Sequence, residues 1–138
     1  MDIKIRYLSK TGNTKKIALA IAEELNIEAK TIEEPVDKAD LLFIGGALYG
    51  DKINSNLKTF ISKLDNNIKT VVIFGTSASK NTVYKELKTY LDEKNISVHD
   101  KTFNSPGNFL FYQFKRPNKE DLNNAKTFAK EIKTELDK

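Results

Sequence analysis

The residues with the clearest chemical potential form the run SKTGNT, which lies between an apolar alternation at Ile3, Ile5 and Tyr7 and the helix-like segment KKIALAIAEEL. Hydroxyl and amide side chains can donate hydrogen bonds to an anion, and the glycine lets the backbone approach it closely. A helix beginning here adds unpaired amide N–H groups and the positive end of its dipole. The run therefore predicts a phosphate site. Its candidate ligands are Ser9, Lys10, Thr11, Gly12, Asn13 and Thr14.

The alternative for this run is a plain helix N-cap in a polar loop, because Ser, Thr and Asn are the usual capping residues. A cap needs one such residue, whereas the run has four. The sequence has no GxGxxG motif, which weakens a dinucleotide site, and no GxxxxGK[ST], which excludes a Walker-type nucleotide hydrolase. Neutral hydroxyls and amides suit a permanently held phosphomonoester better than a phosphoryl group transferred with Mg²⁺.

Composition excludes several other classes of protein. The chain has 138 residues, enough for one domain with a core of its own, and no cysteine, so disulfides, thiolate catalysis and cysteine-bound metals are excluded. A single histidine, His99, is too little for a histidine-based metal site. The 23 basic and 19 acidic residues are well mixed, which is far from a nucleic-acid signature. No apolar run approaches a membrane span and no signal peptide is visible, so we expect a cytoplasmic protein.

Strand-like and helix-like segments alternate along the chain. Apolar spacing predicts strands at 3–8, 27–32, 41–44, 70–74 and 96–103, and helices at 14–25, from near 55, around 83–91 and from 118 onward. The two central strands are expected to end at Gly45-Gly46 and at Gly75. This alternation predicts an α/β fold, a single doubly wound domain with a five-stranded parallel sheet and helices on both faces.

The first strand fits this scheme poorly, because Lys4 and Arg6 alternate with Ile3 and Ile5 where both faces should be apolar. Either the stems of Lys4 and Arg6 lie along apolar surface with their charged heads in water, or one face of the sheet is less covered here. The sequence leaves both possibilities open.

With these segments in place, the chain resembles the flavodoxin-like family. SKTGNT is similar to the family's phosphate loop, [TS]-x-T-G-x-T, which holds the phosphate of FMN, and the segments IGGALYGDKI and FGTSASKNT follow the third and fourth strands. The resemblance covers residues 1–138 as one FMN-binding domain and implies the strand order 2-1-3-4-5. The Tyr-Gly pair and the tail FNSPGNFLFYQFKRP are closer to the branch of short-chain flavodoxins and menaquinone-linked protoporphyrinogen oxidases than to the acidic electron carriers.

This resemblance implies two segments that bracket the flavin ring. They comprise Ala47, Leu48, Tyr49 and Gly50 after the third strand and Thr76, Ser77, Ala78 and Ser79 after the fourth. Tyr49 is the candidate for stacking on the ring, with a surface tyrosine as the alternative. Gly50 would permit the peptide reversal by which flavodoxins bond the reduced ring. Unlike the acidic flavodoxins, the second segment has neither an aromatic nor an acidic residue.

Four lysines, Lys10, Lys15, Lys16 and Lys52, would make the rim of this site basic. Taken singly, each is an ordinary solvated lysine. Together they suggest that the reduced, anionic form of FMN is stabilised, so that its reduction is easier than in acidic flavodoxins.

Four aromatic residues, Phe109, Phe111, Tyr112 and Phe114, cluster before the last helix. They either pack beneath that helix or form an apolar lip that covers the flavin or contacts a redox partner or quinone. Lys115 and Arg116 could pair with an acidic partner or form a solvated turn.

The function that follows is electron transfer by bound FMN, to or from a redox partner protein or a small acceptor such as a quinone or tetrapyrrole. Such a protein would be an FMN-dependent oxidoreductase or a non-enzymatic carrier. No nucleophile–base pair suited to hydrolysis is visible, so no catalytic residue is assigned. The alternative is a flavodoxin-fold accessory module that binds flavin weakly or not at all, suggested by the missing second aromatic wall and the absence of tryptophan.

Overall fold

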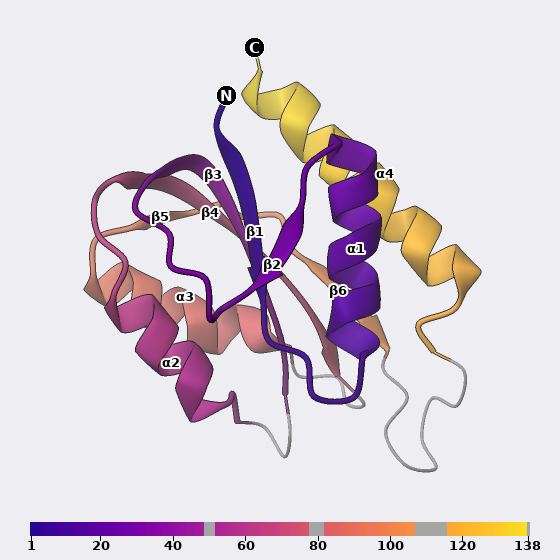
Figure 1. The fold of residues 1–138 in the computed structure, drawn as a ribbon, viewed down its shortest axis with the longest axis horizontal. Coiled ribbons are helices and arrows are strands. Elements are labelled where there is room, and N and C mark those ends of the chain that lie inside the picture. The colour runs from indigo at the N-terminus through magenta and orange to yellow at the C-terminus, as the bar shows by residue number, and fades with distance from the viewer. Residues whose placement is uncertain (49–51, 78–81, 107–115, 138) are drawn as a thin grey trace.

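A computed structural model describes residues 1–48, 52–77, 82–106 and 116–137 of the chain, and Figure 1 shows its fold. The strands are β1 (Ile3–Tyr7), β2 (Ala29–Thr31), β3 (Ala39–Ala47), β4 (Ile68–Ser77), β5 (Ser97–Val98) and β6 (Phe103–Pro106). The helices are α1 (Asn13–Leu25), α2 (Ser55–Ser62), α3 (Val83–Glu93) and α4 (Lys119–Leu136). The described strands and helices follow the predicted order, with no helix between β2 and β3 or between β5 and β6. Within the described residues, no helix is long and apolar enough to cross a membrane.

The sheet is parallel throughout and has the order β2-β1-β3-β4-β5, which confirms the predicted topology. The fifth position, however, is divided between two short strands. Ser97 pairs with Thr70 near the start of β4, whereas Phe103 pairs with Phe74 and continues along its second half. The prediction of one strand at 96–103 is therefore wrong in its extent, because the polar residues between Val98 and Phe103 leave the sheet before the chain rejoins it.

Helices cover both faces of this sheet, as Figure 1 shows. α1 and α4 lie side by side on one face, over a core that includes Ile5, Phe43 and Phe74. α2 and α3 cover the other face, over a core that includes Leu42, Ile44 and Ile73. β3 and β4 contribute to both cores, which explains why their sequences are continuously apolar rather than alternating.

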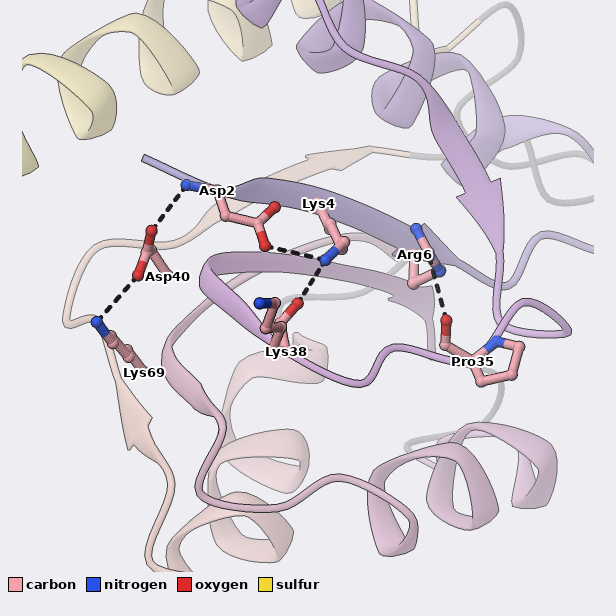
Figure 2. A network of polar contacts seen from close by, with 7 residues as sticks. All are labelled: Asp2, Lys4, Arg6, Pro35, Lys38, Asp40 and Lys69. Atoms are coloured by element: carbon pink, nitrogen blue, oxygen red, sulfur yellow. Dashed lines mark hydrogen bonds and ion pairs between the residues drawn. The ribbon is translucent and has the colours of Figure 1, made fainter.

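The face of β1 on the α2 side is covered differently, because the connection from β2 to β3 contains no helix. Residues 32–38 form a connection without regular secondary structure across this face, and their carbonyl groups accept hydrogen bonds from side chains of β1. Arg6 satisfies them: Nε donates to the Glu34 carbonyl at 2.9 Å and Nη2 to the Pro35 carbonyl at 3.3 Å. Figure 2 shows the contact with Pro35. Arg6 is only 6% exposed, and this burial lowers the pKa of its guanidinium.

Lys4, the other cation of β1, lies at the amino edge of the same face in a network shown in Figure 2. Its Nζ donates to Asp2 Oδ2 at 3.0 Å and to the Lys38 carbonyl. Asp40 accepts from the Asp2 backbone at 2.8 Å and pairs with Lys69 at 3.2 Å. Neither of the two possibilities for β1 is correct as stated, because the face is covered by the connection that replaces a helix, and both cations bind carbonyl groups of that connection.

The predicted start of the last helix is confirmed. Asn118 Oδ1 accepts from the Asp121 amide at 2.9 Å and Asp121 Oδ2 accepts from the Asn118 amide at 2.8 Å, which completes a capping box. Arg116 adds two further bonds to the same carboxylate, at 2.6 and 2.7 Å. These bonds lower the pKa of Asp121, with the Arg116 side chain as the largest cause.

The glycines at the ends of the central strands have a packing role rather than the predicted role of ending the strands. β3 continues through Gly45 and Gly46 to Ala47, and β4 continues through Gly75 to Ser77. A Cβ on Gly45 would lie 2.2 Å from the Phe74 ring, and one on Gly75 would lie 2.6 Å from the Gly46 carbonyl oxygen. Small residues are needed here because the Phe74 ring and the two backbones occupy the space of a side chain.

Candidate functional site

The carboxyl ends of three neighbouring strands are held together at one edge of the sheet. After β1, the Leu8 amide donates to the Gly45 carbonyl of β3 at 3.1 Å. After β3, the Leu48 amide donates to the Thr76 carbonyl of β4 at 3.3 Å. Ligands of open α/β sheets bind at this edge, where the direction of strand order reverses. In this chain the reversal falls between β1 and β3, directly beside the SKTGNT run.

The run forms a turn that leads straight into α1. Gly12 is the N-cap residue and has φ +92°, a conformation that L residues with a side chain rarely adopt. No atom lies within 4 Å of the position its Cβ would take, so the space above it is open. Ser9 Oγ accepts from the amides of Gly12 and Lys15, at 3.1 Å each. Ser9 therefore caps the start of α1. The alternative interpretation, a plain helix cap, needs only this one residue.

The remaining polar groups of the turn are in excess of what capping needs. Thr11 is exposed, and its hydroxyl bonds to no other described residue. The first turn of α1 contains no acidic residue, although carboxylates are favoured there, and carries Lys15 and Lys16 instead. Two cations at the positive end of a helix dipole each cost a few tenths of a kcal/mol up to about 1 kcal/mol. This donor set, with its excess of positive charge, suits a bound phosphate monoester.

Thr14 is placed differently from the rest of the run. It is 1% exposed, and its Oγ1 lies 3.0 Å from Oγ1 of Thr76, which is fully buried at the end of β4. The hydroxyl pair fixes the start of α1 to the end of β4 across 62 positions of sequence. Thr14 and Thr76 thus hold two parts of the site together. Asn13 is also buried, at 4% exposed, beside this contact.

The two segments predicted to bracket a ring are only partly described. Ala47, Leu48, Thr76 and Ser77 are buried and lie at the carboxyl edge next to the turn. The other predicted residues of these segments, and the aromatic cluster, lie outside the described residues. They are Tyr49, Gly50, Ala78, Ser79, Phe109, Phe111, Tyr112 and Phe114, together with Lys115.

The structure adds one residue that the sequence analysis did not select, Asn104 on β6. Its Nδ2 donates to Ser77 Oγ at 3.2 Å, which places it against the end of β4. Its Oδ1 is buried and accepts no hydrogen bond. A buried acceptor without a donor is unusual, and it lies at the edge where ligands bind. The signal in the sequence was a polar residue, Asn104, directly after the apolar Phe103. Phe103 packs against α4.

Two hollows flank the site. One of about 390 Å³ opens beside Ser9 between residues 31–35 and α2. The other, of about 910 Å³, runs between α2 and α3 and reaches Leu48 and Lys52. Neither contains a cluster of metal-ligating side chains, and no such cluster occurs among the residues described.

Comparison with known proteins identifies the family and the fold of the chain. A flavodoxin domain family model matches residues 4–131. An uncharacterised protein of Methanocaldococcus jannaschii is 30% identical over 134 residues, which cover 87% of this chain and 89% of that protein.

Two solved structures have the same fold. A flavodoxin from the domain Archaea superposes with a TM-score of 0.80 at 17% identity and covers 100% of both chains. A flavoprotein from Lactobacillus acidophilus, solved in complex with FMN, superposes with a TM-score of 0.58 at 18% identity and covers 78% of this chain and 93% of its own. The matched family model includes the described strands, apart from Ile3 at the start of β1, and the capping box of α4, and the chain belongs to the flavodoxin domain family.

Proposed function

We propose that this chain binds FMN at the carboxyl edge of its sheet and transfers electrons between that cofactor and another molecule. The observation that carries the proposal is the start of α1, where an open turn of neutral donors meets a helix terminus with two lysines and no carboxylate. The family to which the chain belongs and the FMN-bound flavoprotein of the same fold support the choice of cofactor.

The phosphate is assigned to residues 9–14. The Thr11 hydroxyl would donate directly, because it is exposed and bonds to no other described residue. The amides of Gly12 and Lys15, which converge on Ser9 Oγ, already point at a single oxygen acceptor. The positive φ of Gly12 keeps this surface free of a side chain. Lys10 and Asn13 complete the set, while the Thr14 hydroxyl anchors the turn to Thr76.

The flavin ring is assigned to the segments 47–50 and 76–79. Leu48 and Thr76 are joined by a backbone hydrogen bond, so the described starts of the two segments lie side by side. Tyr49 remains the proposed stacking residue and Gly50 the proposed site of the peptide reversal. Ala47, Ser77, Ala78 and Ser79 would form the rest of the ring's surroundings. Bound FMN would supply one- and two-electron redox chemistry. The chain's own part would be to bind and orient the ring and to set the charge around it.

The wider assignment rests on the same site. We propose that residues 1–138 act as one FMN-binding domain in the cytoplasm, in the short-chain branch that includes the menaquinone-linked protoporphyrinogen oxidases. A redox protein, a quinone or a tetrapyrrole would exchange electrons with it. The tail FNSPGNFLFYQFKRP and the Tyr49-Gly50 pair support this branch.

The proposal is tested by FMN titration of the purified protein, with quenching of flavin fluorescence as the readout. Thr11→Val should weaken FMN binding by about 1.5 to 3 kcal/mol, or roughly tenfold to a hundredfold, because it removes one hydrogen bond to a charged group. Thr127→Val is the matched control, because Thr127 is an exposed threonine on α4, away from the site. A protein that ignores added FMN, or equal losses in the two variants, would refute the assignment.

A further inference from the structure

Charge is distributed unequally between the two edges of the sheet. At the amino edge, cations and carboxylates pair with one another: Lys4 bonds to Asp2 and Lys69 to Asp40, as Figure 2 shows. Within these pairs, each charge is compensated by its partner.

Among the described residues of the carboxyl edge, which carries the candidate site, three lysines lack this compensation. Lys15, Lys16 and Lys52 are exposed, and none of them pairs with a carboxylate of the described residues. Lys10 is exposed in the same turn. Lys10, Lys15 and Lys16 lie on one side of the site, before and within the first turn of α1, and Lys52 lies on the other, in the hollow that reaches Leu48. We call these four residues the basic rim.

Among the described residues, the carboxylates near this edge lie in the two hollows. Glu33 lines the hollow beside Ser9, and Glu86 and Glu93 line the one between α2 and α3. Glu120 follows Lys119 at the start of α4, so the pair is neutral. Over the described residues, the lysines of the rim and of the two hollows outnumber these glutamates, so their summed charge is positive.

A partner that exchanges electrons with a cofactor at this edge must approach the edge itself, so it must approach the basic rim. Complementary charge speeds such encounters and like charge opposes them. We propose that this face docks an electron-transfer protein whose own docking face is acidic. The inference rests on the proposed function, because it takes the position of the cofactor from it.

The experiment uses an acidic [2Fe–2S] ferredoxin as the probe and basic cytochrome c as the opposite probe. Biolayer interferometry measures association rates and does not require bound FMN. Stopped-flow spectroscopy measures electron-transfer rates of the FMN-loaded protein. With the ferredoxin, the association rate should fall about tenfold or more between 20 and 300 mM salt, because screening removes the steering field. With cytochrome c it should stay constant or rise with salt.

Variants assign the effect to the rim. Lys15→Gln with Lys16→Gln should lower the ferredoxin association rate at 20 mM salt by about threefold or more. The matched control is Lys130→Gln with Lys133→Gln. It removes the same charge from exposed positions near the C-terminal end of α4 and should leave the rate unchanged. Thermal unfolding of both variants checks that each is folded.

Faster association with cytochrome c at low salt, an equal effect of the control pair, or binding of duplex DNA in preference to the ferredoxin would overturn the proposal. Failure of the proposed function looks different. In that case FMN would not bind and no electrons would be transferred, while the association rates with ferredoxin could still follow the rim.

Discussion

The hydroxyl pair of Thr14 and Thr76 gives a direct test of how the site is assembled. The two Oγ1 atoms are 3.0 Å apart, and the residues are 1% and 0% exposed. Replacing either threonine by valine keeps the shape of the side chain but leaves the other hydroxyl without this partner and out of reach of water. An unsatisfied buried group of this kind costs about 1 to 3 kcal/mol.

The double variant Thr14→Val with Thr76→Val should behave differently from the sum of the singles. Because both polar groups are removed together, neither is left unpaired, and the replacement approaches neutrality. We therefore expect each single variant to lose about 2 kcal/mol of unfolding free energy and the double variant to lose less than either single alone. For a chain of 138 residues, 2 kcal/mol corresponds to a fall in Tm of about 7 °C.

Urea unfolding of the four proteins, followed by circular dichroism, measures these energies as a double-mutant cycle. The m-values should agree, so that differences in midpoint report stability alone. FMN affinity measured on the same proteins should fall in both singles, because the turn loses its attachment to β4. Additive losses in the cycle would refute the reasoning, since they would mean that the two hydroxyls do not depend on each other.

Four further results are expected. Gly12→Ala should lose about 1 to 2 kcal/mol of stability because of its φ of +92° and not because of a clash, whereas Gly12→Asn should lose less, as compared by urea unfolding. Arg6→Met should lower the free energy of unfolding by about 2 kcal/mol or more, because the carbonyls of residues 34 and 35 lose their donor. Arg6→Lys should recover only part of this loss, because an ammonium group lacks the fork geometry of a guanidinium. Asp121→Asn should be less stable than the wild type near neutral pH, and this difference in stability should narrow below about pH 4. The reason is that a carboxylate with a lowered pKa loses its stabilising effect as it is protonated. Urea unfolding at a series of pH values measures the difference. Replacing Lys15 and Lys16 by Glu should move complete reduction of bound FMN to more negative potentials in a spectroelectrochemical titration, and an unchanged potential would show that the rim does not set the charge felt by the ring.

The parts of the fold that the sequence predicts well are those in which one strong physical preference acts alone. The continuous apolar runs around Phe43 and Val72 are typical of strands covered on both sides, and the structure places them at the centre of the sheet. The capping residues Asn118 and Asp121 mark the start of α4 because their side chains reach only the nearest amides.

Other features depend on contacts between distant segments. The glycines at 45, 46 and 75 resemble strand ends in the sequence, and their true role depends on the Phe74 ring, the Leu57 side chain and the neighbouring backbone. Arg6 resembles a surface cation, and its burial depends on carbonyls 28 and 29 positions away. The division of the fifth position between β5 and β6 depends on which half of β4 remains open.

The candidate site divides in the same way. The turn at Gly12 was predictable, because the residue types, the preceding strand and the following helix are contiguous in the sequence. Two other features of the site were not predictable, because they join elements that meet only in the fold. The pairing of Thr14 with Thr76 joins α1 to β4, and Asn104, with its unsatisfied acceptor, joins β6 to β4.

The central claim is that the turn at residues 9–14 binds the phosphate of FMN, and the comparison of FMN with riboflavin tests it most directly. The two ligands share the ring and the ribityl chain and differ only in the phosphate. Titration by fluorescence quenching should give an FMN dissociation constant at least about a hundredfold below that of riboflavin, from two or more charge-assisted hydrogen bonds. Equal affinities for the two ligands would contradict the claim, because the turn would then contribute nothing to binding.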